Sequence, residues 1–67
     1  MPTAVDRAAA RIREEFDEMP GLALTPEQAA RFLGLEESIA RSAVEHLVVT
    51  GWLTKGRRGA QIGRAHV

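Results

Sequence analysis

Two glycines divide the stretch of residues 25–53 and constrain the fold more than any other feature of this chain. Gly34 and Gly51 each follow an amphipathic segment, and glycine is the residue that most often ends a helix. The stretch therefore predicts a short helix of about two turns, a tight corner, and a longer helix from about Glu37 to Val49. An apolar, β-prone segment follows Gly51.

Local signals support both helices. Thr25 and Pro26 make a strong helix start, since threonine caps well and proline suits the first helical position. Gln28 completes a capping box with Thr25, and Leu35 is expected to fill the corner between the helices. The residues predicted to face inward are Ala29, Ala30, Phe32 and Leu33 in the short helix, and Ala40, Ala43, Val44, Leu47 and Val48 in the longer one.

A first helix is predicted before this stretch. Thr3 and Asp6 resemble a capping box, and Pro20 disfavours a helical conformation at the residue before it. We therefore expect the helix to end near Glu18. Its apolar stripe is Val5, Ala8, Ala9, Ile12, Phe16 and Met19. The alternating residues 22–24 are too few to stand alone and suggest a short edge strand.

A hairpin is predicted after the long helix. Residues 52–54 and 60–62 are β-prone, and the segment between them contains two arginines bracketed by glycines. Leu53 and Ile62 are expected to point to the core. Residues 63–67 are expected to be frayed. The chain of 67 residues is long enough for a single domain, with an ordered core from about residue 4 to residue 64.

Charge is distributed unevenly although the net charge is zero. Residues 51–67 contain Lys55, Arg57, Arg58 and Arg64 and no acidic residue, a balance of +4, so the preceding residues carry −4. This asymmetry suggests a C-terminal end that faces a polyanion. Arginine binds phosphate in a bidentate manner, and a glycine-bracketed loop can approach a backbone closely. The alternative is a solvated basic tail.

Composition argues against several functional classes. The chain has no cysteine, and His46 and His66 have no neighbouring ligand cluster, so we expect no metal site. Ser42 and His46 lie one helical turn apart but have no third orienting group, so we expect no catalysis. No glycine-rich phosphate loop, membrane span or signal peptide is recognisable. We expect a cytoplasmic protein that is not an enzyme and uses no cofactor or small-molecule ligand.

With these residues in view, the chain resembles the winged helix-turn-helix superfamily of small bacterial DNA-binding regulators. The matching positions are Ala30-x-x-Leu33-Gly34, Val44-x-x-Leu47-x-x-x-Gly51-Trp52-Leu53 and the Gly-Arg-Arg-Gly sequence at 56–59. The resemblance covers roughly residues 4–64. It implies an α+β fold, with three helices followed by a C-terminal β-hairpin wing.

The resemblance also implies double-stranded DNA as the partner of a transcriptional or phage-type regulator. The helix at about 37–49 would enter the major groove, while a basic wing at 55–59 would lie on the backbone. The implied DNA-binding residues are Glu37, Ser38, Arg41, Ser42 and Glu45 on the long helix, Lys55, Arg57 and Arg58 on the wing, and Gln28 and Arg31 on the short helix.

Other interpretations remain open at this point. Arg41 could pair with a guanine edge, or it could bridge Glu37 or Glu45, each four residues away. The alternative for the two serines, Glu45 and the basic loop is solvated surface. The alternative function is a winged-helix module for protein interaction or dimerisation without DNA binding. A homodimer would use the first helix or the surface around Trp52.

Overall fold

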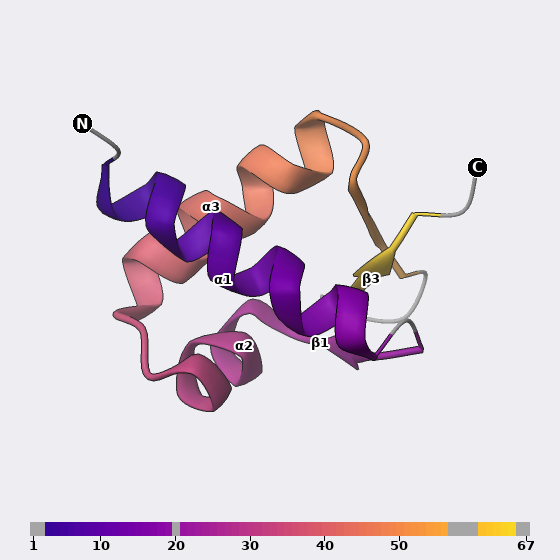
Figure 1. The fold of residues 1–67 in the computed structure, drawn as a ribbon, viewed down its shortest axis with the longest axis horizontal. Helices are drawn as coiled ribbons and strands as arrows, with labels where there is room; N and C mark the ends of the chain where they lie inside the picture. The colour runs from indigo at the N-terminus through magenta and orange to yellow at the C-terminus, as the bar shows by residue number, and fades with distance from the viewer. Residues whose placement is uncertain (1–2, 20, 57–60, 66–67) are drawn as a thin grey trace.

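The chain is a small α+β protein, and the part of it that the structure describes forms three helices and a three-stranded antiparallel sheet (Figure 1). The computed structural model describes residues 3–19, 21–56 and 61–65. In chain order the elements are α1 (Ala4–Glu18), β1 (Ala23–Leu24), α2 (Pro26–Leu33), α3 (Glu37–Val49), β2 (Leu53–Lys55) and β3 (Ile62–Arg64). No helix among these segments is long and apolar enough to cross a membrane.

Both predicted capping boxes are present. The Thr3 hydroxyl of α1 accepts the Asp6 N–H at 3.1 Å, and the Asp6 carboxylate accepts the Thr3 N–H at 3.1 Å. At α2, the Thr25 hydroxyl accepts the Gln28 N–H at 3.1 Å, while the Gln28 side-chain oxygen accepts the Thr25 N–H at 3.0 Å. Each box satisfies backbone donors that have no partner within the helix. The predicted ends at Glu18 and Gly34 are also confirmed.

The corner between α2 and α3 depends on a left-handed residue. Gly34 has φ +67°, a conformation that a side chain disfavours. The Leu35 N–H then donates to the Ala30 carbonyl at 2.8 Å, which satisfies one of the last carbonyls of α2. Gly51 has φ +85° and redirects the chain from α3 towards β2 in the same way.

The sheet has the order β1-β3-β2, so β3 is central. Ala23 of β1 pairs with Gly63 of β3, and Thr54 of β2 pairs with Gly63 from the other side. Compared with the predicted strands at 52–54 and 60–62, β2 begins one residue later and β3 begins two residues later. The prediction of a frayed end from residue 63 is wrong for residues 63 and 64, which belong to β3. Pairing on both sides orders this segment. A Cβ at Gly63 would lie 3.3 Å from the Leu22 carbonyl oxygen, so a glycine suits this close approach.

The core lies between α1 and α3 and is closed by the sheet (Figure 1). Its largest fully buried side chains are Phe16, Ile12, Leu53 and Ile62, and the inward orientation predicted for the last two is confirmed. Small residues line the helix crossings, which lets the helices approach closely. The buried alanines are Ala8, Ala9, Ala29, Ala30, Ala40 and Ala43.

Some apolar residues predicted to be inward are not buried. Phe32 is 55% exposed, and Met19 is also exposed. Leu33, Leu35 and Val48 are half-buried and pack against the core from its edge. The short helix α2 buries only a narrow stripe, and Phe32 lies about 160° around the helix from Ala30. The pattern of apolar residues alone did not show where that stripe ends.

Candidate functional site

The outer face of α3 presents most of the polar residues singled out from the sequence. Glu37, Ser38, Arg41, Ser42 and Glu45 are all exposed. The opposite face of the same helix is buried in the core, at Ala40, Ala43, Val44 and Leu47. A helix held by one face against a core presents its other face in a fixed orientation. The structure therefore brings the five predicted α3 residues together on one rigid surface.

Arg41 forms ion pairs on this surface. One guanidinium nitrogen, Nη2, lies 3.0 Å from the Glu27 carboxylate of α2 and 3.7 Å from the Glu37 carboxylate. The Glu37 pair was one of the two predicted. Among the described residues, Glu45 forms no ion pair with Arg41. The second carboxylate that pairs with Arg41 is that of Glu27, because α2 packs across α3. The Arg41 side chain is 53% exposed, so these pairs are screened by solvent and weakly stabilising.

The first turn of α3 has no side-chain cap. Glu36 occupies the N-cap position but makes no capping hydrogen bond to the helix. Its carboxylate instead accepts the hydroxyl of Ser38 at 2.8 Å. The first backbone N–H groups of α3 therefore keep their donor capacity for water or a ligand, while two glutamates place negative charge beside them.

A surface pocket of about 260 Å³ joins α3 to the start of α2 and to the sheet. It is lined by Pro26, Arg41, Val44, Glu45 and Lys55. Three residues predicted to bind DNA thus meet at one hollow, although Lys55 comes from β2 and the other two from α3.

The remaining predicted residues are placed differently. The side-chain oxygen of Gln28 is engaged in the α2 capping box, so only its amide nitrogen remains to donate elsewhere. Arg31 is exposed in the last turn of α2. Arg57 and Arg58, which were predicted to form the tip of the basic loop, lie outside the described residues.

Sequence reasoning missed a stack around Trp52. The Arg64 guanidinium lies 3.9 Å from the indole ring centroid, and that of Arg13 lies 5.2 Å away. Arg64 also donates to the Trp52 backbone carbonyl at 2.7 Å. These contacts join α1 to β3 through a half-buried tryptophan. The sequence assigns Arg64 to the basic C-terminal end expected to face a polyanion; in the structure its guanidinium lies against the ring.

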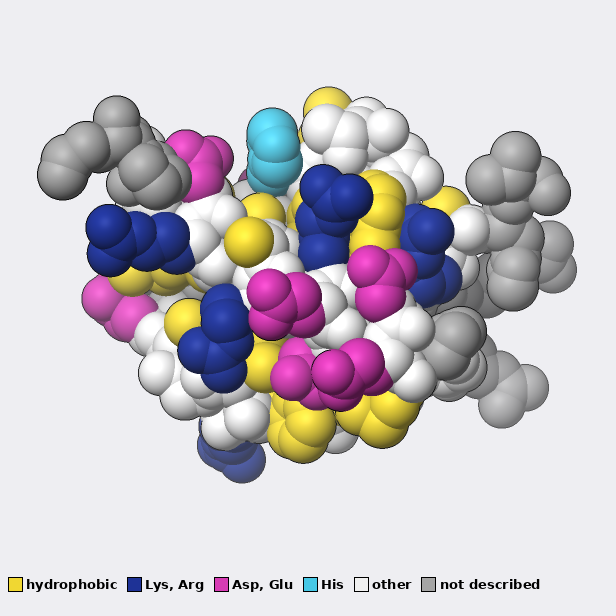
Figure 2. Space-filling model, in the orientation of Figure 1, with side chains coloured by type: hydrophobic (Ala, Val, Ile, Leu, Met, Phe, Trp, Pro, Cys, Tyr) yellow, Lys and Arg dark blue, Asp and Glu magenta, His cyan; other side chains and the backbone are white. Residues whose placement is uncertain are grey.

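No group of three potential metal-ligating side chains occurs within the described segments. Figure 2 shows one face of the molecule, on which basic and acidic side chains are interspersed with hydrophobic ones rather than segregated. No protein-family model, no curated protein and no solved structure matches this chain.

Proposed function

We propose that this chain is a small winged helix-turn-helix protein that binds double-stranded DNA, as a transcriptional or phage-type regulator would. In this proposal α3 enters the major groove, and the basic segment at residues 55–59 lies on the phosphate backbone. A palindromic target would be bound by two copies, one on each half-site.

The observation that carries the proposal is the outer face of α3. It is a helical surface with exposed polar residues, supported from behind by the core, and it stands next to a short antiparallel sheet. A helix of 13 residues is about 20 Å long, and the major groove of B-DNA is about 12 Å wide and admits one helix. Ser38 and Ser42 can donate to or accept from either bases or phosphates.

Arg41 is the residue best suited to base recognition in this arrangement. Its ion pairs with Glu27 and Glu37 are solvent-exposed, and such pairs contribute about 0–1 kcal/mol. The side chain can therefore exchange these partners for a guanine edge, with which arginine makes two hydrogen bonds. Until DNA binds, the two glutamates hold the guanidinium on the α3 face.

The basic segment supplies the sequence-independent part of the affinity. Lys55 is exposed at the end of β2 and lines the hollow beside Arg41. Arg57 and Arg58 follow directly in the sequence, after Gly56. Lysine and arginine that neutralise phosphates release counterions, so their contribution appears as a steep dependence of affinity on salt.

The charge of the α3 surface favours a second candidate, a protein-interaction module. Glu36, Glu37 and Glu45 outnumber the single arginine on this helix, so the balance at the surface is negative. A phosphate backbone would be repelled by that balance, whereas a basic protein surface would be attracted by it. The two candidates predict opposite responses to duplex DNA.

A salt titration separates them. Binding of a fluorescent random-sequence duplex is measured by anisotropy between about 50 mM and about 200 mM salt, where a regulator should lose affinity steeply. Replacing Arg57 and Arg58 with alanine should lower the slope of log affinity against log salt by about 0.9 for each phosphate that is no longer neutralised. Arg7→Ala removes one charge of the same type from the far flank of the molecule and is the control, compared per charge removed.

Two outcomes would contradict the proposal. A flat salt response, or no binding of duplex at the lower salt concentration, would favour the interaction module. A slope that falls by the same amount per charge removed in the Arg7→Ala control and in the loop variant would show that only net charge matters. If duplex binding is found, selection from a random DNA library should then enrich a defined motif.

A further inference from the structure

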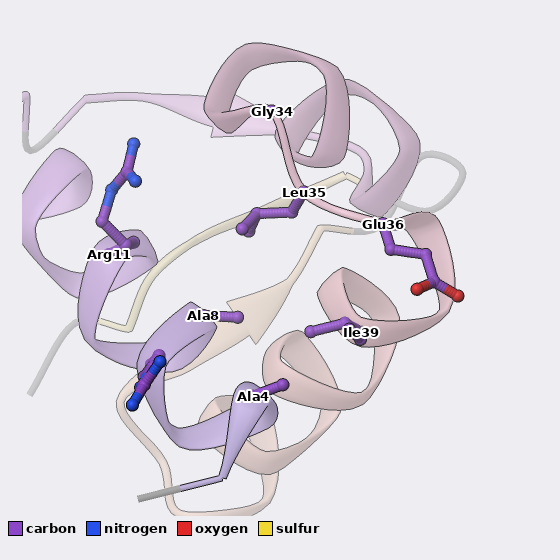
Figure 3. A pocket seen from close by; sticks show the side chains of 8 residues that line it. Ala4, Ala8, Arg11, Gly34, Leu35, Glu36 and Ile39 are labelled. Atoms are coloured by element: carbon purple, nitrogen blue, oxygen red, sulfur yellow. The ribbon is translucent and has the colours of Figure 1, made fainter.

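A second hollow lies on the other side of α3, between the N-terminal half of α1 and the α2–α3 corner (Figure 3). Its volume is about 410 Å³, and it opens to solvent. The lining residues are Ala4, Arg7, Ala8, Arg11, Gly34, Leu35, Glu36 and Ile39. We call it the α1–corner pocket.

The floor of this pocket is apolar. Leu35 points from the corner towards α1, and Ala8 and Ile39 approach the same space from the two long helices (Figure 3). Ala8 is fully buried, whereas Leu35 and Ile39 are only half-buried. Covering their exposed parts would remove further apolar surface from water, at about 25 cal/mol for each Å². The floor therefore suits one large apolar side chain.

The α1 wall of the pocket is basic. Arg7 and Arg11 lie one helical turn apart, so their like charges disfavour each other slightly. Neither forms an ion pair within 4 Å with any described residue. Figure 2 shows basic side chains beside hydrophobic surface near the N-terminal end of α1, at the left of the view. The two arginine side chains that line this wall have no carboxylate partner in the described segments, and such groups favour an anionic ligand.

The acidic residue of the pocket does not neutralise this wall. The Glu36 side chain points away from Leu35, on the opposite side of the pocket from Arg11 (Figure 3). Its carboxylate accepts the Ser38 hydroxyl at 2.8 Å. A group that enters beside the apolar floor therefore meets the positive charge of Arg7 and Arg11.

We propose that the α1–corner pocket binds an acidic peptide segment of a partner protein. A large aliphatic or aromatic side chain of the peptide sits on Leu35, Ile39 and Ala8. Neighbouring aspartates or glutamates of the peptide accept hydrogen bonds from Arg7 and from Arg11. A peptide fits better than a small molecule, because small-molecule sites usually enclose most of the ligand, and this pocket is open on one side.

A second copy of the chain fits the pocket less well. A two-fold contact centred here would bring the same surface together from both copies. Two hollows would then face each other, with the arginine pairs close to the contact and the apolar floors uncovered. A protruding side chain from a different protein fills the hollow directly.

The peptide site is separate from the proposed DNA surface. Ile39 and Arg41 are two residues apart on α3, about 200° around the helix. The α1–corner pocket and the hollow at Arg41 and Lys55 thus lie on opposite flanks of the same helix. A partner protein can therefore occupy one flank while a duplex occupies the other, and the peptide proposal does not depend on DNA binding.

The test is selection of a phage-displayed random peptide library on the folded chain. The enriched peptides are expected to combine a large apolar residue with aspartate or glutamate. A synthetic copy of an enriched peptide is then titrated by anisotropy against three proteins: the parent chain, Arg7→Glu with Arg11→Glu, and Arg41→Glu. The Arg7/Arg11 variant should bind at least about tenfold more weakly, as expected when charge-assisted hydrogen bonds are removed.

A charge exchange makes the test independent of subtle folding effects. A second peptide carries lysine in place of each acidic residue, and it should bind the Arg7/Arg11 variant better than it binds the parent chain. Arg41→Glu reverses a charge on the other flank and should change the affinity less than about twofold. Circular dichroism of each variant checks that the helices are retained.

Several results would overturn the proposal. The proposal is contradicted if the selection enriches basic peptides or enriches no peptide. It is also contradicted if the Arg7/Arg11 variant binds the peptide with the affinity of the parent chain. A concentration-dependent dimer in sedimentation that this variant abolishes would assign the pocket to a second copy. A salt slope for duplex binding that falls by about two in Arg7→Ala with Arg11→Ala would assign the arginines to phosphates.

Discussion

The helical part of this molecule and its sheet contribute very unequally to the core. Four residues of α1 and four of α3 are buried. The sheet adds Leu53 and Ile62, from strands of only two or three residues. A sheet this small is not stable by itself, so its position depends on the helices to which these two side chains attach it.

This difference bears on both candidate sites. The outer face of α3 and the α1–corner pocket are carried by the helices that build the core, so their geometry is fixed by the same packing. Lys55 is carried by the sheet, which is attached to the core through Leu53 and Ile62. Core substitutions should therefore disturb the α3 face and the sheet together.

The largest expected effect compares two phenylalanines. Phe16 is 1% exposed and Phe32 is 55% exposed. Phe16→Ala should cost about 3–5 kcal/mol, which is a large part of the roughly 3–10 kcal/mol expected for a chain of this length. Phe32→Ala should cost less than about 1 kcal/mol. Urea unfolding followed by circular dichroism measures both, and equal losses would show that α1 does not anchor the core.

The next effect tests how firmly the sheet is attached. Leu53 is 1% exposed in β2, whereas Val49 is 79% exposed at the end of α3. Leu53→Ala should cost about 2–5 kcal/mol, and Val49→Ala should stay within about 0.5 kcal/mol of the parent. Thermal unfolding reports both values. A loss below about 1 kcal/mol for Leu53→Ala would mean that the sheet is not coupled to the helical core.

The smallest effect concerns the corner that orients α3. Neither Gly34 nor Gly21 has a neighbouring atom within 4 Å of an added Cβ, but only Gly34 has a left-handed backbone. Gly34→Ala should therefore cost about 1–2 kcal/mol through backbone strain alone. Gly21→Ala should be neutral or stabilise by up to about 1 kcal/mol. Chemical denaturation measures the free energy of unfolding of both variants, and the difference between them isolates the backbone strain at Gly34. Equal values for the two variants would show that the strain does not lie at Gly34.

Local signals in the sequence predicted most of the helical framework. Thr3, Thr25 and Gly34 set helix ends through hydrogen bonds and backbone conformations that involve neighbours along the chain. Such features depend on only a few adjacent residues, so they can be recognised without knowing the rest of the fold. The predicted span of α3, from Glu37 to Val49, is confirmed as well, although its first turn has no side-chain cap.

Features that depend on distant residues were not predictable in this way. Glu27 meets Arg41 across 14 positions, and Arg64 meets Trp52 across 12, so neither pair follows from helical spacing. The pairing of β3 with β1 as well as with β2 joins segments that are distant along the chain. The α1–corner pocket combines α1 with the α2–α3 corner, and no sequence pattern linked its two halves.

The proposed role of α3 is tested most directly by mapping a duplex onto the chain. A short random-sequence duplex is titrated into ¹⁵N-labelled protein, and amide chemical shifts are followed by NMR. The proposal predicts that the largest changes fall on residues 37–45 and on Lys55, with little change at Arg7 and Arg11. Changes confined to α1, or an unchanged α3 at saturating duplex, would contradict it.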